Sequence, residues 1–326
     1  MTSLPEHRQA ALARLGETLN GDGSLRLAIT GATGWLGAAL AEMALRAGLT
    51  PENGRLRLFG ARSRPVRFAG GQDLPVEALE GARPLEGDGW LVAHFAFLGK
   101  ERTVDLSPEA FSAANDAVLT QVQALLAGTT AARVIFASSG AAYSPLGGMV
   151  RTLVESPYGY LKVLHEKALT DWCRSHGFPL VIPRVFNVGG PHGNKLGLYA
   201  MSSLIQAAMQ GGPLVIKAKR PVFRSYVHVE ELMAVLCDLA VRAELEETLV
   251  FDTGGREVVE VGDLAGMIAE RFNLDRSTIE RDYDPGQPED WYVGAPRVYQ
   301  AAVARAGLEA ITLAQIVDDA ILDMTP

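Results

Sequence analysis

Residues 25–37 read LRLAITGATGWLG, and this stretch decides the fold. A short apolar run is followed by Gly31, Gly34 and Gly37, which stand at the start of a predicted helix. At such a junction glycines permit a tight turn, a close approach of the backbone to a pyrophosphate, and close packing of the helix on the strand. The first N–H groups of the helix and its dipole also favour an anion. We therefore predict a dinucleotide-binding turn formed by Gly31, Thr33, Gly34, Trp35, Leu36 and Gly37. On the spacing alone, G-x-x-G-x-x-G, a glycine-rich helix start without a ligand is the alternative.

The rest of the chain alternates short apolar runs with helical stretches, which is typical of a parallel sheet with crossover helices. We predict strands over 25–29, 55–59, 90–97, 133–137 and 179–183. We predict helices over 35–47, 108–127, 157–175, 197–210, 229–243, 262–271 and 312–323. The region 60–89 is rich in Gly, Pro and Arg and is expected to be mostly loop. The fold class is α/β, with a Rossmann-type doubly wound parallel sheet and a smaller mixed α/β substrate-binding part in the C-terminal half.

Three parts of the chain follow from this pattern. Residues 1–24 form an N-terminal extension with an amphipathic helix over 5–19, which we expect to pack on the outside. Residues 25–183 form the NAD(P)-binding domain, completed by parts of 222–252. Residues 184–326 are mainly the substrate-binding part.

Composition excludes several classes of protein. The chain has 326 residues, 48% of them hydrophobic, with a formal charge of -8, which argues against a nucleic-acid surface. No apolar run is long enough to span a membrane and the first residues do not resemble a signal peptide, so we expect a cytoplasmic protein. The two cysteines, Cys173 and Cys237, and the histidines show no metal-ligand spacing, so no metal is expected.

Tyr158 and Lys162 lie four residues apart on a predicted helix and therefore on one face. A neighbouring ammonium would lower the pKa of the phenol, which could then exchange a proton with a substrate hydroxyl or carbonyl while a hydride moves to or from the cofactor. Ser138 and Ser139 end a strand at the carboxyl edge of the predicted sheet, where ligands bind in open α/β folds. Taken singly, the Tyr-Lys pair could be a solvated helix face and the serines a turn or helix cap.

These motifs, in this order, resemble the extended short-chain dehydrogenase/reductases of the nucleotide-sugar epimerase/dehydratase family. TGATGWLG resembles the cofactor turn, and HFAF, which contains Ala96, resembles the fourth strand of the family. SSGAAY, PYGYLK, PRVFNVGGP and RSYVHVEEL resemble the segments that follow, over about residues 25–250. The resemblance covers most of the chain.

The resemblance implies roles for particular residues. Ser139, Tyr158 and Lys162 would be the catalytic trio, with Tyr158 and Lys162 also contacting the cofactor beside Ala96. The substrate would contact Ser138, Ser139, Asn187 and Arg224, with Asn187 and Arg224 at its phosphates, since an arginine fork can pair two phosphate oxygens. A surface arginine is the alternative for Arg224. A homodimer through the helices over 108–127 and 157–175 is also implied.

The sequence departs from the family at two places. No carboxylate ends the second strand, where Arg62, Ser63 and Arg64 could instead accept a 2′-phosphate, so either NAD or NADP is expected with a lean toward NADP. A basic loop that does not touch the cofactor is the alternative. Gly140 and Ala141 stand where family dehydratases carry an Asp-Glu pair and where epimerase-reductases carry a cysteine.

The leading hypothesis is therefore 4-epimerisation of a nucleotide-activated sugar through a 4-keto intermediate. The first alternative is an NADPH-dependent reductase of a sugar or another small carbonyl compound. An alternative of another class is a non-catalytic NAD(P)-binding sensor. The acidic stretch over 282–291 is expected to be a solvated loop.

Overall fold

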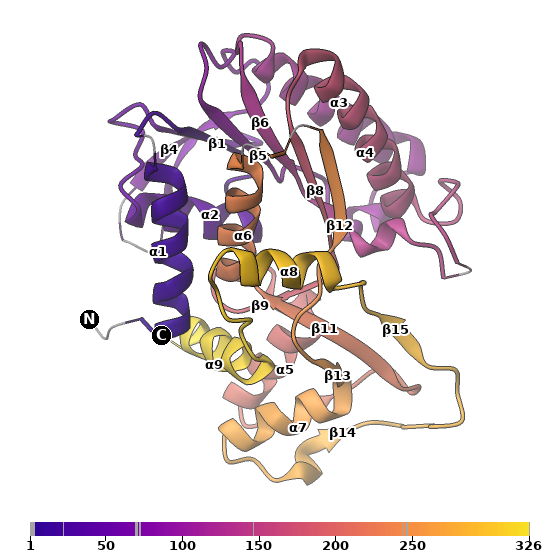
Figure 1. Cartoon of the computed structure of the whole chain (residues 1–326). Coiled ribbons are helices and arrows are strands. Elements are labelled where there is room, and N and C mark those ends of the chain that lie inside the picture. The colour runs from indigo at the N-terminus through magenta and orange to yellow at the C-terminus, as the bar shows by residue number, and fades with distance from the viewer. Residues whose placement is uncertain are drawn as a thin grey trace.

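The computed structural model describes residues 4–21, 23–68, 71, 73–145, 147–242, 244–245 and 247–325. Its centre is a sheet with the strand order β12-β8-β6-β5-β1-β2-β4-β3, and β7 also pairs with β8. These strands are β1 (Arg26–Thr30), β2 (Leu56–Gly60), β3 (Arg64–Arg67), β4 (Asp73–Ala78), β5 (Trp90–His94), β6 (Ala132–Phe136), β7 (Ser138–Ser139), β8 (Leu180–Val185) and β12 (Thr248–Asp252). All of them pair in parallel except β3, which is antiparallel to β4. The expected Rossmann-type sheet is thus confirmed (Figure 1).

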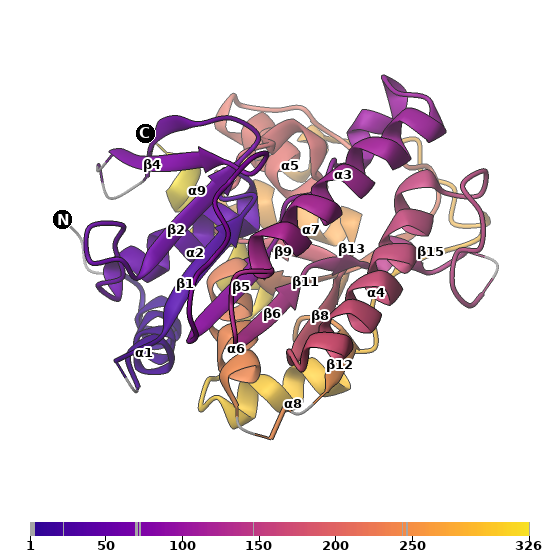
Figure 2. The same cartoon turned by 90° about the horizontal axis from the view of Figure 1, so that it is seen from above.

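Helices cover both faces of this sheet (Figure 2). On one face lie α2 (Trp35–Arg46) and α6 (Val229–Val241), and on the other lie α3 (Pro108–Leu126) and α4 (Pro157–His176). Side chains along β1 alternate accordingly, because Leu27 and Ile29 join the cluster of α2 and α6 whereas Ala28 joins that of α3 and α4. A strand that is buried on both faces is typically a continuous apolar run in the sequence, and β1 has this pattern.

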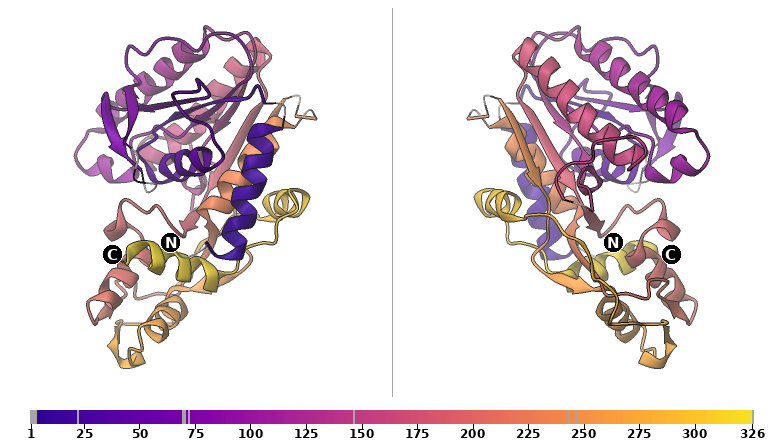
Figure 3. Two further views of the ribbon diagram at one scale, coloured as in Figure 1. Left: turned by 90° about the vertical axis from the view of Figure 1, so that its left-hand side faces the viewer. Right: turned by 90° about the vertical axis from the view of Figure 1, so that its right-hand side faces the viewer.

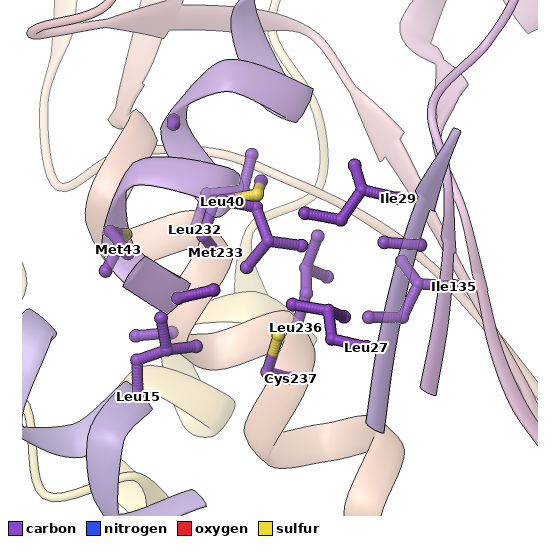
Figure 4. Packing of buried hydrophobic residues seen from close by; sticks show 14 of the residues in the cluster. Leu15, Leu27, Ile29, Leu40, Met43, Ile135, Leu232, Met233, Leu236 and Cys237 are labelled. Carbon is purple, nitrogen blue, oxygen red and sulfur yellow. The ribbon is translucent and has the colours of Figure 1, made fainter. Parts of the chain in front are cut away.

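Helix α1 (Glu6–Asn20) packs outside α6 and against α2. Its apolar side contributes Leu15 and Leu19, both fully buried, to the cluster that α2, α6 and β1 share (Figure 4). Leu232 and Leu236 of α6 belong to the same cluster. The extension is thus part of this core.

A smaller part lies beyond the carboxyl edge of the sheet (Figure 3). Its sheets consist of β9 (Asn187–Gly189), β11 (Val222–His228), β13 (Val258–Glu260) and β15 (Asp290–Tyr292), and of β10 (Leu214–Val215) with β14 (Ile279–Glu280). Its helices are α5 (Ala200–Met209), α7 (Val261–Arg271) and α9 (Leu313–Met324), while α8 (Arg297–Arg305) packs on α6 and β12. Short 3-10 helices are η1 (Lys100–Val104), η2 (Gly140–Ala142), η3 (Leu196–Leu198) and η4 (Arg276–Thr278).

The described part of the structure contains one α-helix that the sequence did not predict, α8, and strands in two stretches that were expected to be loop. The region 60–89 contains β3 and β4, joined as a hairpin, so the third parallel strand is reached without a crossover helix. The acidic stretch over 282–291 is not loop throughout, because β15 begins at Asp290 and pairs with β11. Among the described residues, no helix combines the length and hydropathy that crossing a membrane requires.

Candidate active site

The phosphate turn has the geometry that its glycines predict. Gly31 has φ 72°, and a Cβ there would lie 2.7 Å from the backbone nitrogen of Ala96. A Cβ on Gly37 would lie 2.2 Å from the carbonyl oxygen of Gly31. Helix α2 begins after Gly34, and no side chain caps its first N–H groups. These groups fit a bound pyrophosphate, because uncapped N–H groups at a helix start favour an anion.

A loop of the second half of the chain lies against this turn. The amide nitrogen of Asn194 donates to the carbonyl oxygen of Thr33 at 2.7 Å, and the indole N–H of Trp35 donates to the carbonyl oxygen of Pro191 at 2.7 Å. Trp35 also contacts the ring of Tyr199, with 5.4 Å between ring centroids. Two residues of the predicted cofactor turn are therefore held by the segment that follows β9.

Arg62 and Ser63 follow β2 at the carboxyl edge of the sheet. The Ser63 hydroxyl accepts a hydrogen bond from the backbone of Ala78 at 2.8 Å, and so connects β2 to the end of β4. Arg62 and Arg64 are exposed, and within the described part of the chain no carboxylate lies within salt-bridge distance of either. Both guanidinium groups are thus available to an anionic ligand.

Three hydroxyl groups from three elements converge beyond β6. Ser139 of β7 is near enough to Tyr158 of α4 to lower the pKa of that phenol, and its Oγ lies 3.4 Å from the phenol oxygen of Tyr292 on β15. The Ser139 hydroxyl also accepts the backbone N–H of Ala141 at 3.1 Å, which fixes its orientation. Ser139 therefore stands between two phenols, one expected from the sequence and one that was not.

The start of α4 determines where Tyr158 lies. The Ser156 hydroxyl caps the helix by accepting the N–H of Gly159 at 3.1 Å. A Cβ on Gly159 would lie 2.0 Å from the carbonyl oxygen of Ala141, so only glycine lets α4 approach η2 this closely. Burial raises the pKa of Tyr158 above its usual value, and Tyr292 raises it further. In this structure the phenol is a proton donor at neutral pH.

Lys162 lies one turn further along α4 and is almost completely buried. Its ammonium donates to the carbonyl oxygen of Ala137 at 2.7 Å and stands 3.7 Å from the ring centroid of Phe97. It lies 5.7 Å from the ring centroid of Tyr158, and burial lowers the pKa of Lys162 to about 7. The expected lowering of the pKa of Tyr158 by Lys162 is not found, because burial of the phenol dominates.

Ser138 is turned to a supporting network. Its hydroxyl donates to Glu166 of α4, which forms an ion pair with Arg184 at 2.7 Å. Arg184 also donates to the hydroxyl of Tyr143 at 2.8 Å, and Tyr143 donates to Asp252 at 2.8 Å. Of the two serines, Ser139 faces the phenols and Ser138 ties the strand ends to α4.

Asn187 and Arg224 both contact the segment around Tyr292. The side-chain amide of Asn187 donates to the carbonyl oxygens of Ser225 and Tyr292, at 3.1 and 3.2 Å. The guanidinium of Arg224 pairs with Asp290 at 3.2 Å and lies 5.7 Å from the ring centroid of Tyr292. Sequence reasoning missed Tyr292, since only the pairing of β15 with β11 brings it to the site.

An aromatic wall explains the glycine that follows Ser139. A Cβ on Gly140 would lie 2.5 Å from the ring of Phe186, which packs against Tyr292 with 4.8 Å between ring centroids. An acidic side chain or a cysteine at residue 140 would overlap this ring. The site thus offers hydroxyl groups where the acid of a dehydratase would stand.

Among the described residues, one cluster has the spacing of metal ligands, formed by His7, His228 and Asp319. Both histidines contact the same Asp319 oxygen through Nε2, at 2.6 and 3.0 Å. Nδ1 of His228 accepts the backbone N–H of Glu230, so the ring proton of neutral His228 is on Nε2 and points at Asp319. A metal on Nε2 would need a proton on Nδ1, facing that N–H donor. The hydrogen bonding therefore suits a buried polar cluster and not a metal site.

The dinucleotide turn, the hydroxyl groups and the buried lysine at one sheet edge define an NAD(P)-dependent enzyme of the short-chain dehydrogenase/reductase type. The sequence model of the NAD-dependent epimerase/dehydratase family matches residues 27–248, and the chain belongs to this family. This membership does not fit a non-catalytic sensor.

Curated relatives and solved structures agree with the family. A trifunctional UDP-glucose 4,6-dehydratase/UDP-4-keto-6-deoxy-D-glucose 3,5-epimerase/UDP-4-keto-L-rhamnose-reductase of Arabidopsis thaliana is 30% identical over 129 residues, which is 39% of this chain and 19% of that protein. The chain thus spans less than a fifth of this relative. MoeE5 in complex with UDP-glucose and NAD has a TM-score of 0.67 at 22% identity, over 91% of this chain and 97% of that one. The UDP-glucose 4-epimerase of Thermus thermophilus in complex with NAD has a TM-score of 0.64 at 18% identity, over 92% and 98%. At these identities the solved structures show the fold.

Proposed function

We propose that this protein is an NAD(P)-dependent 4-epimerase of a nucleotide-activated sugar. The observation that carries the proposal is the group of hydroxyls formed by Ser139, Tyr158 and Tyr292, with Gly140 pressed against Phe186. This site can move a proton on and off a sugar oxygen. Among the described residues, no carboxylate forms a hydrogen bond with Ser139 that could serve in the elimination of water.

In the proposed reaction each residue of the site has its own role. When bound, an oxidised nicotinamide would accept a hydride from the sugar carbon and favour the phenolate of Tyr158 by its positive charge. Tyr158 takes the proton of the sugar hydroxyl as the carbonyl forms, and returns it when the carbonyl is reduced from the other face. Ser139 orients the reacting oxygen, and Tyr292 offers a hydrogen bond to the same oxygen or its neighbour. Arg224 and Asn187 are the groups we assign to the phosphates of the substrate, which requires Arg224 to leave Asp290 in part.

A reductase is the second candidate, and one observation favours it. Arg62 and Arg64 are exposed between the end of β2 and the start of β3, where a 2′-phosphate would lie. A reductase consumes its reduced cofactor and must exchange it at each turnover, whereas an epimerase regenerates its own.

Two measurements test the proposal. Protein purified without added cofactor is denatured, and any dinucleotide released is identified by mass spectrometry. Retained NAD supports the epimerase, whereas an empty protein that binds NADPH from solution supports the reductase. Turnover is then followed with a panel of nucleotide sugars. Tyr158→Phe should reduce it by at least about a hundredfold while cofactor affinity stays within about twofold, since the phenol acts in proton transfer. An active Tyr158→Phe protein would contradict the mechanism.

A further inference from the structure

We propose that helix α1 braces the cofactor turn, with Arg8 as a positioning residue that acts through Glu230 and His192. This inference goes beyond the proposed function, because it assigns a role to a helix that the family model does not cover. It depends on the cofactor turn and not on the substrate.

The first step joins α1 to the start of α6. Arg8 donates through Nε and Nη2 to the two carboxylate oxygens of Glu230, at 2.7 Å each. The side chains are only 8% and 7% exposed. Burial would raise the pKa of Glu230, but its hydrogen bonds with Arg8 and His192 outweigh burial and hold the pKa at about 2. A bidentate, buried pair of this kind fixes both position and direction.

The second step joins Glu230 to the loop after β9. Nε2 of His192 lies 3.1 Å from the Glu230 oxygen Oε1, which Arg8 also binds. The backbone N–H of His192 donates to Asp323 of α9 at 2.9 Å. A Cβ on Gly190 would lie 2.8 Å from His228, so the loop also packs closely against the His228 ring. His192 itself has φ 66°, in the left-handed region that few residues adopt without support.

The third step joins the loop to the cofactor turn. The residues on either side of His192 make the two contacts already described, Pro191 with Trp35 and Asn194 with Thr33. Arg8 is thus connected to His192 by hydrogen bonds through Glu230, and the backbone on either side of His192 leads to both contacts. Without Arg8, Glu230 remains buried with less compensation, and we expect it to turn toward water and release His192.

The experiment compares two arginines of the same helix. Arg14 also pairs with an acid of α6, Asp238, but Asp238 bonds to no residue of the loop after β9 in the described part of the chain. Arg14→Met therefore also removes an ion pair between α1 and α6, and it leaves the proposed connection intact. Circular dichroism first establishes a temperature at which the compared variants are folded. Isothermal titration calorimetry then gives the dissociation constant of NAD, and of NADP, for the full chain.

We expect Arg8→Met to raise the dissociation constant of the better-bound dinucleotide about tenfold. Arg14→Met should change it less than twofold. His192→Asn gives a second route, because asparagine tolerates a positive φ but is too short to reach Glu230. It should weaken binding as Arg8→Met does, and the double variant should be no weaker than either single one. If Arg8→Met does not fold, the dissociation constant of the dinucleotide for His192→Asn alone tests the proposal. Unchanged affinity in His192→Asn, or equal affinity of Arg8→Met and Arg14→Met, would overturn the proposal.

Discussion

At the scale of single residues, the chemistry of this site depends on one missing side chain. The ring of Phe186 occupies the space that a Cβ at residue 140 would need, and Phe186 in turn packs against Tyr292. The aromatic pair therefore leaves no room for a larger side chain at residue 140 and brings a phenol to the site. A side chain at residue 140 would disturb both the packing of Phe186 and the position of the Tyr292 phenol, so one substitution at this residue tests both.

Gly140→Ala should lower the free energy of unfolding by about 1–3 kcal/mol, because a methyl group there overpacks against Phe186. Urea unfolding measures the change. The same substitution in a Phe186→Leu background should cost clearly less, since the smaller side chain can move aside. Gly197→Ala is the matched control, because a Cβ at residue 197 meets no atom within 4 Å. Equal effects at residues 140 and 197 would refute the overlap.

Tyr292→Phe should lower kcat about tenfold, which is the effect of one neutral hydrogen bond lost from the transition state. The ring remains in contact with Phe186, so cofactor affinity and stability should change little. Steady-state kinetics with the best nucleotide sugar measure kcat and KM. Tyr283→Phe removes an exposed phenol from the same segment and should have no effect. If both variants behave like the wild type, Tyr292 has no part in turnover.

At the scale of elements, the cofactor turn is held by close backbone contacts. Gly37→Ala would place a Cβ 2.2 Å from the carbonyl oxygen of Gly31, so α2 must shift away from β1. We expect a loss of dinucleotide binding of at least about tenfold, measured by calorimetry, because the N–H groups of α2 would leave their positions. Gly16→Ala is the control in an ordinary helix interior, where a Cβ has room, and should stabilise the protein by up to about 1 kcal/mol. Normal binding by Gly37→Ala would contradict this account.

The elements that the sequence predicted well are those with local signals. The residues of the glycine turn lie close together in the sequence, as do Tyr158 and Lys162, and capping by Ser156 is equally local. The hairpin of β3 and β4 was missed because Pro65 and Pro75 within it are unfavourable in strands. Tyr292 lies on a strand of three residues whose position depends on pairing with β11, more than 60 residues earlier. No local pattern reports such a contact.

At the scale of the whole molecule, α1 and α9, the first and last helices of the described residues, meet beside the start of α6 (Figure 1). Helix α1 contributes His7 and Arg8, α6 contributes Glu230, and α9 contributes Asp319. Arg8, Glu230 and Asp319 are buried where these helices meet. The stability of the molecule should therefore depend on pH through this cluster.

Acid should destabilise the protein in a defined range. The pKa of Glu230 is about 2 in the folded chain and near 4.5 when unfolded, so the unfolded chain binds more protons between these values. The stabilisation by Glu230 is complete above about pH 4.5 and is lost as the pH falls toward 2. The pKa of Asp319 is also lowered, by its hydrogen bonds with His228 and His7. Protonation of Asp319 in acid therefore destabilises the folded chain as well. Urea unfolding at pH 7, 4 and 3 should show this loss.

Arg8→Met should change that profile, because Glu230 then loses the hydrogen bond and the charge of Arg8 that lower its pKa, and the pKa moves upward. The folded chain would hold the proton at higher pH than before, so stability would no longer fall as steeply between pH 4.5 and 3, although it would be lower at pH 7 by about 3–5 kcal/mol. Arg14→Met keeps the pair of Arg8 and Glu230 and should retain the wild-type slope. If the slopes of the two variants coincide, the acid sensitivity of the molecule does not originate in the contact between α1 and α6 at Glu230, and carboxylates elsewhere must carry it.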